Sequence, residues 1–369
     1  MSGLDITHFV ENLERGGLER VVIELIRAQR ERGHQCRVIC LFQHGQLAGE
    51  LRDQGVDVQA VGKQAGFDLP AVARARRLLR RNPRTVLHTH NGMSNYYAGL
   101  ASWRLPLLRR INTYHSMPPE QVAGRAEWLY RTSLKHTDVL AAVSELARQR
   151  FHAQGVITRG QMVTVPNGIQ LERFAPATPE HHDRLANELG APRDAILLGT
   201  VGRLHPAKDQ ANLIRAFTRI GPLHPRARLV LVGEGALRGE LEALAQAEGF
   251  AERIHFLGDR SDVPELLRGL DLFVLSSRTE GYSMALLEAC ATALPIVATD
   301  VGGNSEIVRN GVNGRLVESE NPHALADGIH DLLAAPERLA AMGRQGHDWV
   351  RSRGSFRAMA DAYDRLYVG

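Results

Sequence analysis

The chain of 369 residues is 44% hydrophobic and 23% charged, contains three cysteines and carries a formal net charge of +4. Its length exceeds that of one hydrophobic core, so we expect two domains, and its composition is typical of a soluble globular protein. Three cysteines (Cys36, Cys40 and Cys290) fit neither a disulfide framework nor a paired metal-ligand spacing. We therefore expect buried, reduced thiols and a cytoplasmic location. The N-terminal sequence lacks signal-peptide features, and no apolar run reaches the roughly eighteen residues that cross a bilayer.

Positive charge is concentrated in the first half of the chain. Residues 1 to 175 carry 24 Lys and Arg against 15 Asp and Glu, whereas the remainder carries 21 against 26. The segments ARARRLLRRNPR (73–84) and WRLPLLRR (103–110) place arginines among leucines and a tryptophan. Such segments can settle on an anionic membrane surface, and they can equally form a solvated helix face followed by a polar loop. Peripheral membrane contact is therefore one of two open alternatives.

The first half alternates predicted strands and helices. DITHFV (5–10) predicts a strand, and after the loop ENLERGG a helix is expected from Leu18, with apolar residues at helical spacing. Gly33 ends this helix, and CRVICLF is the second predicted strand. Further short buried strands are predicted at TVLHTH, RRINTYH, VLAAVS and MVTVP. Alternation of this kind favours a mostly parallel sheet with helical crossovers.

A second alternating series follows a break. Residues 165–183 begin with the turn Pro166-Asn167-Gly168 and continue as a polar, proline-containing stretch that we interpret as a linker. The series then runs from AILLGTVGRL to PIVATD. We predict two Rossmann-like, doubly wound α/β domains facing across a cleft, with ligands at the carboxyl ends of the strands.

Glycines between the first predicted strand and helix suggest one anion site. Gly16 and Gly17 place backbone N–H groups near a helix start, where a phosphate or sugar can approach closely. The pattern is not a dinucleotide fingerprint, and a simple tight turn explains it as well.

Two motifs in the second half carry more chemistry. In VGRLHPAKD (201–209), Arg203 and Lys208 follow a strand end and are suited to neutralise a diphosphate. In EGYSMALLE (280–288), a helix starts near Ser283, with Glu280 before it and Glu288 in its second turn. Free N–H groups at the helix start form an anion cradle, and carboxylates accept hydrogen bonds from sugar hydroxyls. From spacing alone, a sugar site and a plain helix start remain equal alternatives.

Taken together, these motifs resemble the retaining glycosyltransferases of family 4, which have the GT-B fold. The matching strings span about residues 6 to 318 and are GGLERVVIEL, LHTHN, NTYHSM, VSE, VPNGI, VGRLHPAKD, VGEG, FLG, SSRTEGYSMALLEA, PIVATDVGGNSEIV and NGVNGRLV. The resemblance implies an acceptor-binding domain over residues 1–175, a nucleotide-sugar-binding domain over 176–347, and a C-terminal helix (348–369) that crosses back to the first domain.

The resemblance also implies residue roles. Arg203 and Lys208 hold the donor diphosphate, Glu288 binds the ribose, Glu280 touches the donor sugar, and His115 reaches the reacting centre. The implied catalytic residues are His115, Arg203, Lys208 and Glu280. The implied donor-binding residues are Gly16, Gly17, Gly202, Arg203, Lys208, Gly258, Glu280, Gly281, Tyr282, Ser283, Met284, Leu287 and Glu288. Many relatives have another residue at Ser283, which bears on donor identity.

The implied reaction is metal-independent. His88 and His90 share a strand face, but no acidic residue stands at a zinc-ligand spacing, and the chain contains no D-x-D. We expect a nucleotide-sugar donor, UDP-linked before GDP- or ADP-linked, a glycan or lipid-linked acceptor, and a role in polysaccharide or lipopolysaccharide synthesis. No nucleic-acid partner is expected from 5% aromatic residues and no recognisable module. An epimerase or phosphorylase on the same fold and a catalytically silent binding protein are the alternatives.

Overall fold

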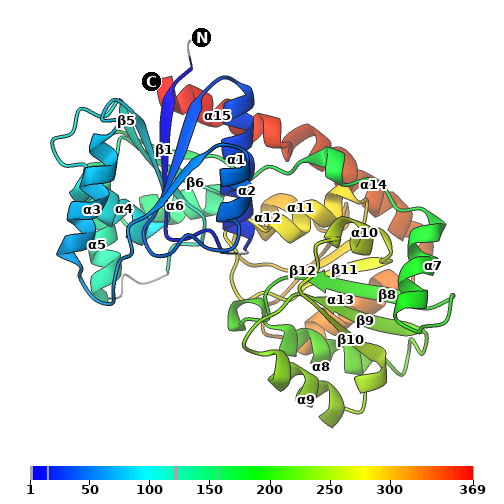
Figure 1. Ribbon diagram of the computed structural model, residues 1–369. Helices are drawn as coiled ribbons and strands as arrows, with labels where there is room; N and C mark the ends of the chain where they lie inside the picture. The colour runs from blue at the N-terminus through cyan, green and yellow to red at the C-terminus, as the bar shows by residue number, and fades with distance from the viewer. Residues whose placement is uncertain (1–2, 15, 120–123, 157, 369) are drawn as a thin grey trace. The chain divides into compact units, whose positions relative to one another are not determined.

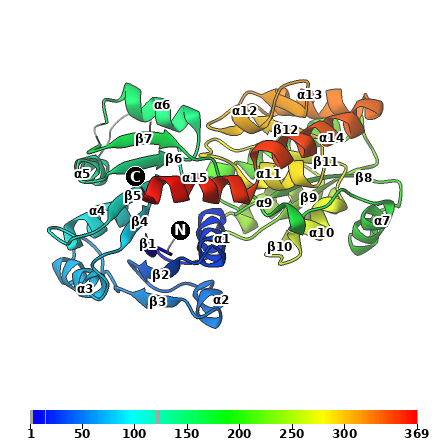
Figure 2. The same ribbon diagram turned by 90° about the horizontal axis from the view of Figure 1, so that it is seen from above.

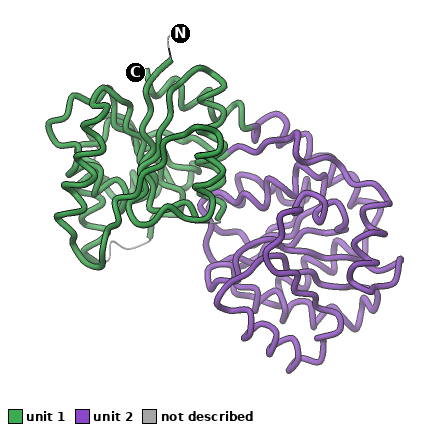
Figure 3. Tube along the Cα trace, in the orientation of Figure 1, with its two compact units in different colours: residues 1–167, 356–369 green, residues 168–355 purple. Residues whose placement is uncertain are grey.

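A computed structural model describes residues 3–14, 16–119, 124–156 and 158–368, which form two compact α/β units (Figure 1). Unit 1 comprises residues 1–167 and 356–369, and unit 2 comprises residues 168–355 (Figure 3). The first division falls inside the predicted turn at Asn167-Gly168, eight residues before the predicted boundary.

Unit 1 is built on a seven-stranded parallel sheet of order β3-β2-β1-β4-β5-β6-β7. Its strands are β1 (Asp5–Val10), β2 (Gln35–Cys40), β3 (Asp57–Ala60), β4 (Val86–His90), β5 (Arg109–Tyr114), β6 (Val139–Ala142) and β7 (Gln161–Thr164). Its helices are α1 (Gly17–Glu31), α2 (Ala48–Asp53), α3 (Leu69–Arg80), α4 (Gly92–Ala101), α5 (Gly124–Leu134), α6 (Glu145–Ala153) and α15 (Phe356–Val368). The strand order reverses between β1 and β4.

Alternating side chains of β1 serve two different cores. Phe9 packs with residues of α3 and α4, whereas Val10 packs with residues of α1 and α2. The same alternation puts His8 on the Val10 face, where α1 and α15 lie side by side (Figure 2). The C-terminal helix α15 thus covers a face of the sheet on which β1 and β4 place polar side chains.

Unit 2 is built on a six-stranded parallel sheet of order β10-β9-β8-β11-β12-β13. Its strands are β8 (Ile196–Val201), β9 (Ala227–Val232), β10 (Ile254–Gly258), β11 (Leu272–Leu275), β12 (Ile296–Thr299) and β13 (Gly314–Val317). Its helices are η1 (Leu171–Arg173), α7 (Pro179–Glu188), η2 (Pro206–Lys208), α8 (Gln210–Ile220), α9 (Arg238–Ala247), η3 (Ala251–Arg253), α10 (Val263–Arg268), α11 (Met284–Ala291), α12 (Asn304–Ile307), α13 (Pro322–Leu333) and α14 (Pro336–Arg353). The strand order reverses between β8 and β11.

Two predicted boundaries are wrong. Residues 179–183 are not linker but the start of α7, where Thr178 and His181 form a capping box and Pro179 takes the first helical position. Residues 348–353 do not cross back, because α14 continues to Arg353 within unit 2 and packs on α11. Gly343 permits this packing, since a Cβ there would lie 1.9 Å from the carbonyl oxygen of Ala293. Only α15 joins unit 1.

No helix in the described part of the chain is long and apolar enough to cross a membrane.

Candidate active site

The loop after β8 carries the two predicted cations. Lys208 ends the short helix η2, and Asp209, buried at 6% exposure, follows it with a left-handed φ of 46°. The side chain of Gln210 donates to the carbonyl oxygen of Arg203 at 2.9 Å, which anchors the loop backbone. The Arg203 guanidinium is exposed and bonds to no described residue. The loop therefore holds Lys208 in a tight turn and leaves the Arg203 fork available to an anion.

Glycines let the loops after β9 and β10 approach this cation loop. A Cβ on Gly233 would lie 2.1 Å from the carbonyl oxygen of Gly202, and one on Gly235 would lie 2.2 Å from that of Leu204. The N–H of Gly233 donates to the carbonyl oxygen of Gly258 at 2.8 Å. Since only glycine fits at 233 and 235, the carboxyl ends of β8, β9 and β10 form one closely packed edge.

The loop after β11 is tied to the same edge through Glu280. Lys208 Nζ lies 2.5 Å from Glu280 Oε1, and the Ser277 hydroxyl donates to the same oxygen at 2.6 Å. Glu280 is 9% exposed, and no described residue bonds its Oε2. Arg278 adds an ion pair with Asp209, in which Nε and Oδ2 lie 3.0 Å apart. The reversal of strand order thus brings Lys208 and Glu280, 72 residues apart in sequence, into direct contact.

The helix predicted at Ser283 begins there. Ser283 caps α11 by accepting the N–H of Leu286 at 3.4 Å, and Glu288 lies half-buried in the second turn. Met284 is the first helical residue, and the carbonyl oxygen of Gly281 accepts the N–H of Gly303 at 3.2 Å. The free N–H groups of this helix start lie in the segment that begins with Glu280.

Two neighbouring side chains are buried around this helix start. Tyr282 is 7% exposed, and burial raises the pKa of its phenol. Leu287 is fully buried, and the Cβ position of Gly354 lies 3.4 Å from its Cδ2. The Leu287 side chain therefore contributes to the packing of α11, and its donor contact stays a prediction.

In unit 1, the predicted glycines and His115 follow strands on either side of the reversal. Gly16 is the N-cap of α1, and Gly17 is its first residue, one position before the predicted start. His115 follows β5 directly, and its backbone N–H donates to Asn91 Oδ1 at 3.0 Å. Asn91 has φ 65° and ψ −179°, a conformation that costs a residue with a side chain on the order of 1–3 kcal/mol. This strained residue fixes the position of His115.

The His115 ring continues into a row of buried histidines. His115 Nε2 lies 3.0 Å from His90 Nδ1, and His90 Nε2 lies 3.0 Å from His8 Nδ1. His88 neighbours both, with ring centroids 4.3 Å from His90 and 5.2 Å from His8. Burial lowers the pKa of His8 to about 4 and that of His115 to about 3, and it lowers those of His88 and His90 well below their ordinary value. The row is therefore uncharged at neutral pH.

These histidines also form one group, among the described residues, whose atoms are close enough for a metal ion. Ligand atoms of His8, His88 and His90 lie within 4.8 Å of one another. Both ring nitrogens of all three residues are already hydrogen-bonded, however, to one another or to Gln29, Tyr367, Thr113 and His115. A metal ion would have to replace these bonds, so the geometry fits a hydrogen-bonded network better than a metal centre.

Sequence reasoning missed several residues that shape both sites. Asn91 and His8 act through contacts between segments of separate strands, which single-sequence patterns do not reveal, whereas Ser277 bonds Glu280 three residues further on. Gly233 and Gly235 carried a signal in the string VGEG, but nothing in the string shows which backbone they approach.

Comparison with known proteins identifies the class of enzyme. The fold of the chain is that of GT-B glycosyltransferases. The crystal structure of Anabaena HepE in complex with UDP and glucose matches it with a TM-score of 0.86 at 21% identity, covering 98% of each chain.

The chain belongs to the group 1 glycosyltransferases. Residues 182–349 match the family described as glycosyl transferases group 1, and residues 15–173 match glycosyltransferase family 4. It is 30% identical over 383 residues to the D-inositol 3-phosphate glycosyltransferase of Geodermatophilus obscurus, covering 92% of this chain and 83% of the relative. It is 28% identical over 259 residues to the UDP-Gal:alpha-D-GlcNAc-diphosphoundecaprenol alpha-1,3-galactosyltransferase of Escherichia coli, covering 68% and 67%.

The buried neutral histidines predict that the protein loses stability in mild acid. Their folded pKa values lie below the ordinary 6.5, so the unfolded chain binds more protons as the pH falls from about 6.5 towards 4. The contribution of these histidines to the free energy of unfolding is therefore fully present above pH 6.5. Below that pH, the free energy of unfolding falls by about 1.4 kcal/mol per pH unit for each such histidine. Urea unfolding followed by circular dichroism at a series of pH values measures this slope.

Two variants make that measurement specific to the buried row. His8→Asn removes one titrating group and should make the slope shallower, whatever its effect on absolute stability. His323→Ala, at an exposed position of α13, should leave the slope unchanged. Equal slopes in wild type and His8→Asn would contradict the assignment.

Proposed function

We propose that this enzyme transfers a sugar, with retention of configuration and without a metal, from a UDP-sugar to a glycan or lipid-linked acceptor in cell-envelope polysaccharide synthesis. The observation that carries the proposal is the cluster at the strand reversal of unit 2. There, Lys208 contacts Glu280, and the Arg203 guanidinium is exposed. An anionic leaving group and a hydroxyl-rich sugar match the donors and acceptors of this cluster.

The cations would act on the leaving diphosphate. As the bond between the anomeric carbon and the phosphate oxygen breaks, negative charge grows on the nucleoside diphosphate. Arg203, Lys208 and the N–H groups at the start of α11 are donors suited to that charge. Lys208 is already oriented by Glu280, so little reorganisation is needed when the charge develops.

The two carboxylates would accept hydrogen bonds from hydroxyl groups of the donor. Glu280 is held by Lys208 and Ser277 through Oε1, which leaves Oε2 to accept from the donor sugar. Glu288, in the second turn of α11, would accept from the ribose. Neither role needs a metal, in keeping with the absence of D-x-D from the sequence.

Unit 1 would contribute Gly16, Gly17 and His115. The N-terminus of α1 is suited to the diphosphate, and His115 to a hydroxyl near the reacting carbon. No carboxylate is assigned as a nucleophile. Same-face attack, with the leaving phosphate accepting the proton of the acceptor hydroxyl, is therefore the route to retention that we propose.

The reaction itself provides the first test. UDP-, GDP- and ADP-sugars would be incubated with diphosphoundecaprenol-linked saccharides, and the products would be analysed by mass spectrometry and by NMR of the new anomeric centre. We expect an α-linked product from a UDP-α-sugar, formed at an undiminished rate in excess EDTA. Isomerised donor without acceptor would instead support an epimerase, and loss of activity in EDTA restored by Mn²⁺ would contradict metal independence.

Removal of either cation should impair the chemical step. Arg203→Ala and Lys208→Ala should each lower kcat/KM by about a hundredfold, or about 3 kcal/mol, because each loses a donor to the developing charge. Arg226→Ala is a matched control, since Arg226 is an exposed arginine of unit 2 that pairs only at the surface with Asp194. Near-normal turnover in both site variants would overturn the assignment of the diphosphate site.

We also propose that the protein contacts the cytoplasmic face of the membrane. This proposal is based on one surface of unit 1. Trp103 and Leu108 are 69% and 55% exposed, and Arg76 of α3 bonds the carbonyl oxygen of Trp103 at 2.7 Å. The arginine-rich end of α3 therefore lies beside exposed apolar side chains, a combination suited to anionic lipid.

Vesicle flotation at low salt tests this surface. The protein should float with phosphatidylglycerol vesicles and not with phosphatidylcholine vesicles, because the attraction is largely electrostatic. Trp103→Ser should weaken flotation several-fold, whereas Trp128→Ser, at a similarly exposed tryptophan of α5, should not. Absence of flotation on anionic vesicles would refute the membrane part of the proposal while leaving the transferase part intact.

A further inference from the structure

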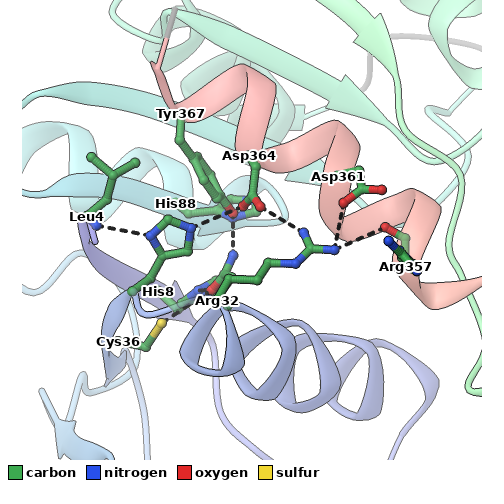
Figure 4. Close-up of polar contacts among 11 residues, drawn as sticks. Leu4, His8, Arg32, Cys36, His88, Arg357, Asp361, Asp364 and Tyr367 are labelled. Carbon is green, nitrogen blue, oxygen red and sulfur yellow. Dashed lines mark hydrogen bonds and ion pairs between the residues drawn. The ribbon is translucent and has the colours of Figure 1, made fainter. Parts of the chain in front are cut away.

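The buried histidine row of unit 1 continues beyond His8 to the C-terminal helix. His8 Nε2 lies 2.8 Å from Gln29 Oε1 on α1, and Gln29 Nε2 donates to the hydroxyl of Tyr367 on α15 at 2.6 Å. Tyr367 in turn bonds His88 Nδ1 at 2.9 Å (Figure 4). Gln29 is fully buried and joins the two branches of this network.

One atom at the far end of the row has no partner. His115 Nδ1 is buried and bonds to no described residue, whereas Nε2 of the same ring is paired with His90. A buried ring nitrogen without a partner is costly, and it is suited to a hydrogen bond with a ligand. Whether it accepts or donates depends on which nitrogen of His115 carries the proton.

The proton positions follow from Gln29, one ring at a time. An amide oxygen only accepts, so His8 carries its proton on Nε2, and its Nδ1 must accept from His90 Nε2. His90 Nδ1 then has no proton and accepts from His115 Nε2. Because each neutral ring has a single proton, His115 Nδ1 is left as a bare acceptor.

Reversal of the Gln29 amide would reverse every bond in the row and make His115 Nδ1 a donor. The contact with Cys36 favours the observed orientation, and the contact with Tyr367 is compatible with it. The Cys36 thiol donates to Gln29 Oε1 at 3.4 Å and stays protonated, because burial raises its pKa to about 12. In this orientation, the Tyr367 hydroxyl accepts a hydrogen bond from the Gln29 amide and donates a hydrogen bond to His88 Nδ1.

We propose that Gln29 and Tyr367 are positioning residues that fix the proton of His115 on Nε2, through His8 and His90, so that Nδ1 accepts a hydrogen bond from a substrate hydroxyl. The substrate part of this inference rests on the proposed function, whereas the proton positions stand on the network alone. The C-terminal helix thereby acts on a residue at the reacting centre without touching substrate.

Helix α15 is held against α1 by contacts outside the row. Arg32 pairs with Asp361 and Asp364, at 2.7 Å in each case, and Figure 4 shows it reaching across to both carboxylates. These ion pairs involve no member of the row. They also supply a control, since they can be weakened without removing any member of the row.

Nitrogen chemical shifts of the histidine rings measure the proton positions directly. In protein labelled with ¹⁵N-histidine, with His115 identified by its absence from a His115→Gln variant, we expect the Nε2–H form in wild type. Gln29→Leu keeps the approximate size of the side chain and removes its hydrogen bonds with His8, Tyr367 and Cys36, and it should give a mixture of the two forms. Tyr367→Phe, a milder change, should shift the same populations if Gln29→Leu does not fold.

Two further variants separate positioning from folding. Gln29→Glu retains an acceptor opposite His8 and should restore the Nε2–H form. Asp361→Asn, which weakens the ion pairs of α15, should leave the His115 ring as in wild type. An Nδ1–H form in wild type, or an unchanged ring in folded Gln29→Leu and Tyr367→Phe, would overturn the proposal.

Kinetics distinguish this inference from the proposed function. Gln29→Leu should lower kcat about tenfold with little change in KM, because one hydrogen bond to the transition state is misaligned. Gln29→Glu should recover most of that loss. If His115→Ala retains wild-type kcat, the proposed use of His115 fails, while the proton positions are still decided by the ¹⁵N shifts.

Discussion

Both units depend on one constraint, the reversal of strand order beside the first strand of each parallel sheet. Neighbouring strands at this point send their following loops in opposite directions, so the loops part and leave backbone groups accessible. In unit 2, the separated loops after β8 and β11 are reconnected by Lys208 and Glu280. In unit 1, β1 and β4 bring His8 opposite His88 in register. The same topology therefore produces a charged cluster in one unit and a neutral polar row in the other.

The two clusters solve opposite electrostatic problems. Lys208 is partly exposed and pairs with the buried carboxylate of Glu280, while the exposed Arg203 guanidinium keeps its charge close to water, as a site for a diphosphate requires. The histidines of unit 1 are buried beneath α15 and remain uncharged, because an unpaired buried charge costs several kcal/mol. The polar groups beneath α15 still need hydrogen-bond partners. Tyr367 bonds His88 and Tyr363 bonds Thr113, which explains why α15 presents two tyrosines to the sheet rather than an entirely apolar face.

Much of the fold could be predicted from sequence because short strand-like segments alternate with segments of helical periodicity along the chain. DITHFV, TVLHTH and AILLGTV were assigned correctly as strands, and the start of α11 at Ser283 was placed correctly from its capping residue. The short edge strands β3 (DVQA) and β13 (GRLV) were not predicted, since each contains a charged residue and only two apolar residues. The linker prediction failed at α7 because proline usually interrupts a helix, whereas Pro179 occupies the first helical position, where proline is favourable.

The amino-acid sequence by itself determined the α/β class, the division into two doubly wound domains, and the candidate diphosphate residues Arg203 and Lys208, since these depend on local periodicity and on motifs a few residues long. Only the tertiary structure decided that Lys208 pairs with Glu280, that Leu287 packs inside, and that His115 continues through His90 and His8 to Gln29 and α15. The physical reason is the short range of these interactions. Hydrogen bonds and ion pairs act over about 3 Å, and only the packing of strands and helices brings together residues that lie up to 338 positions apart, as Gln29 of α1 and Tyr367 of α15 do.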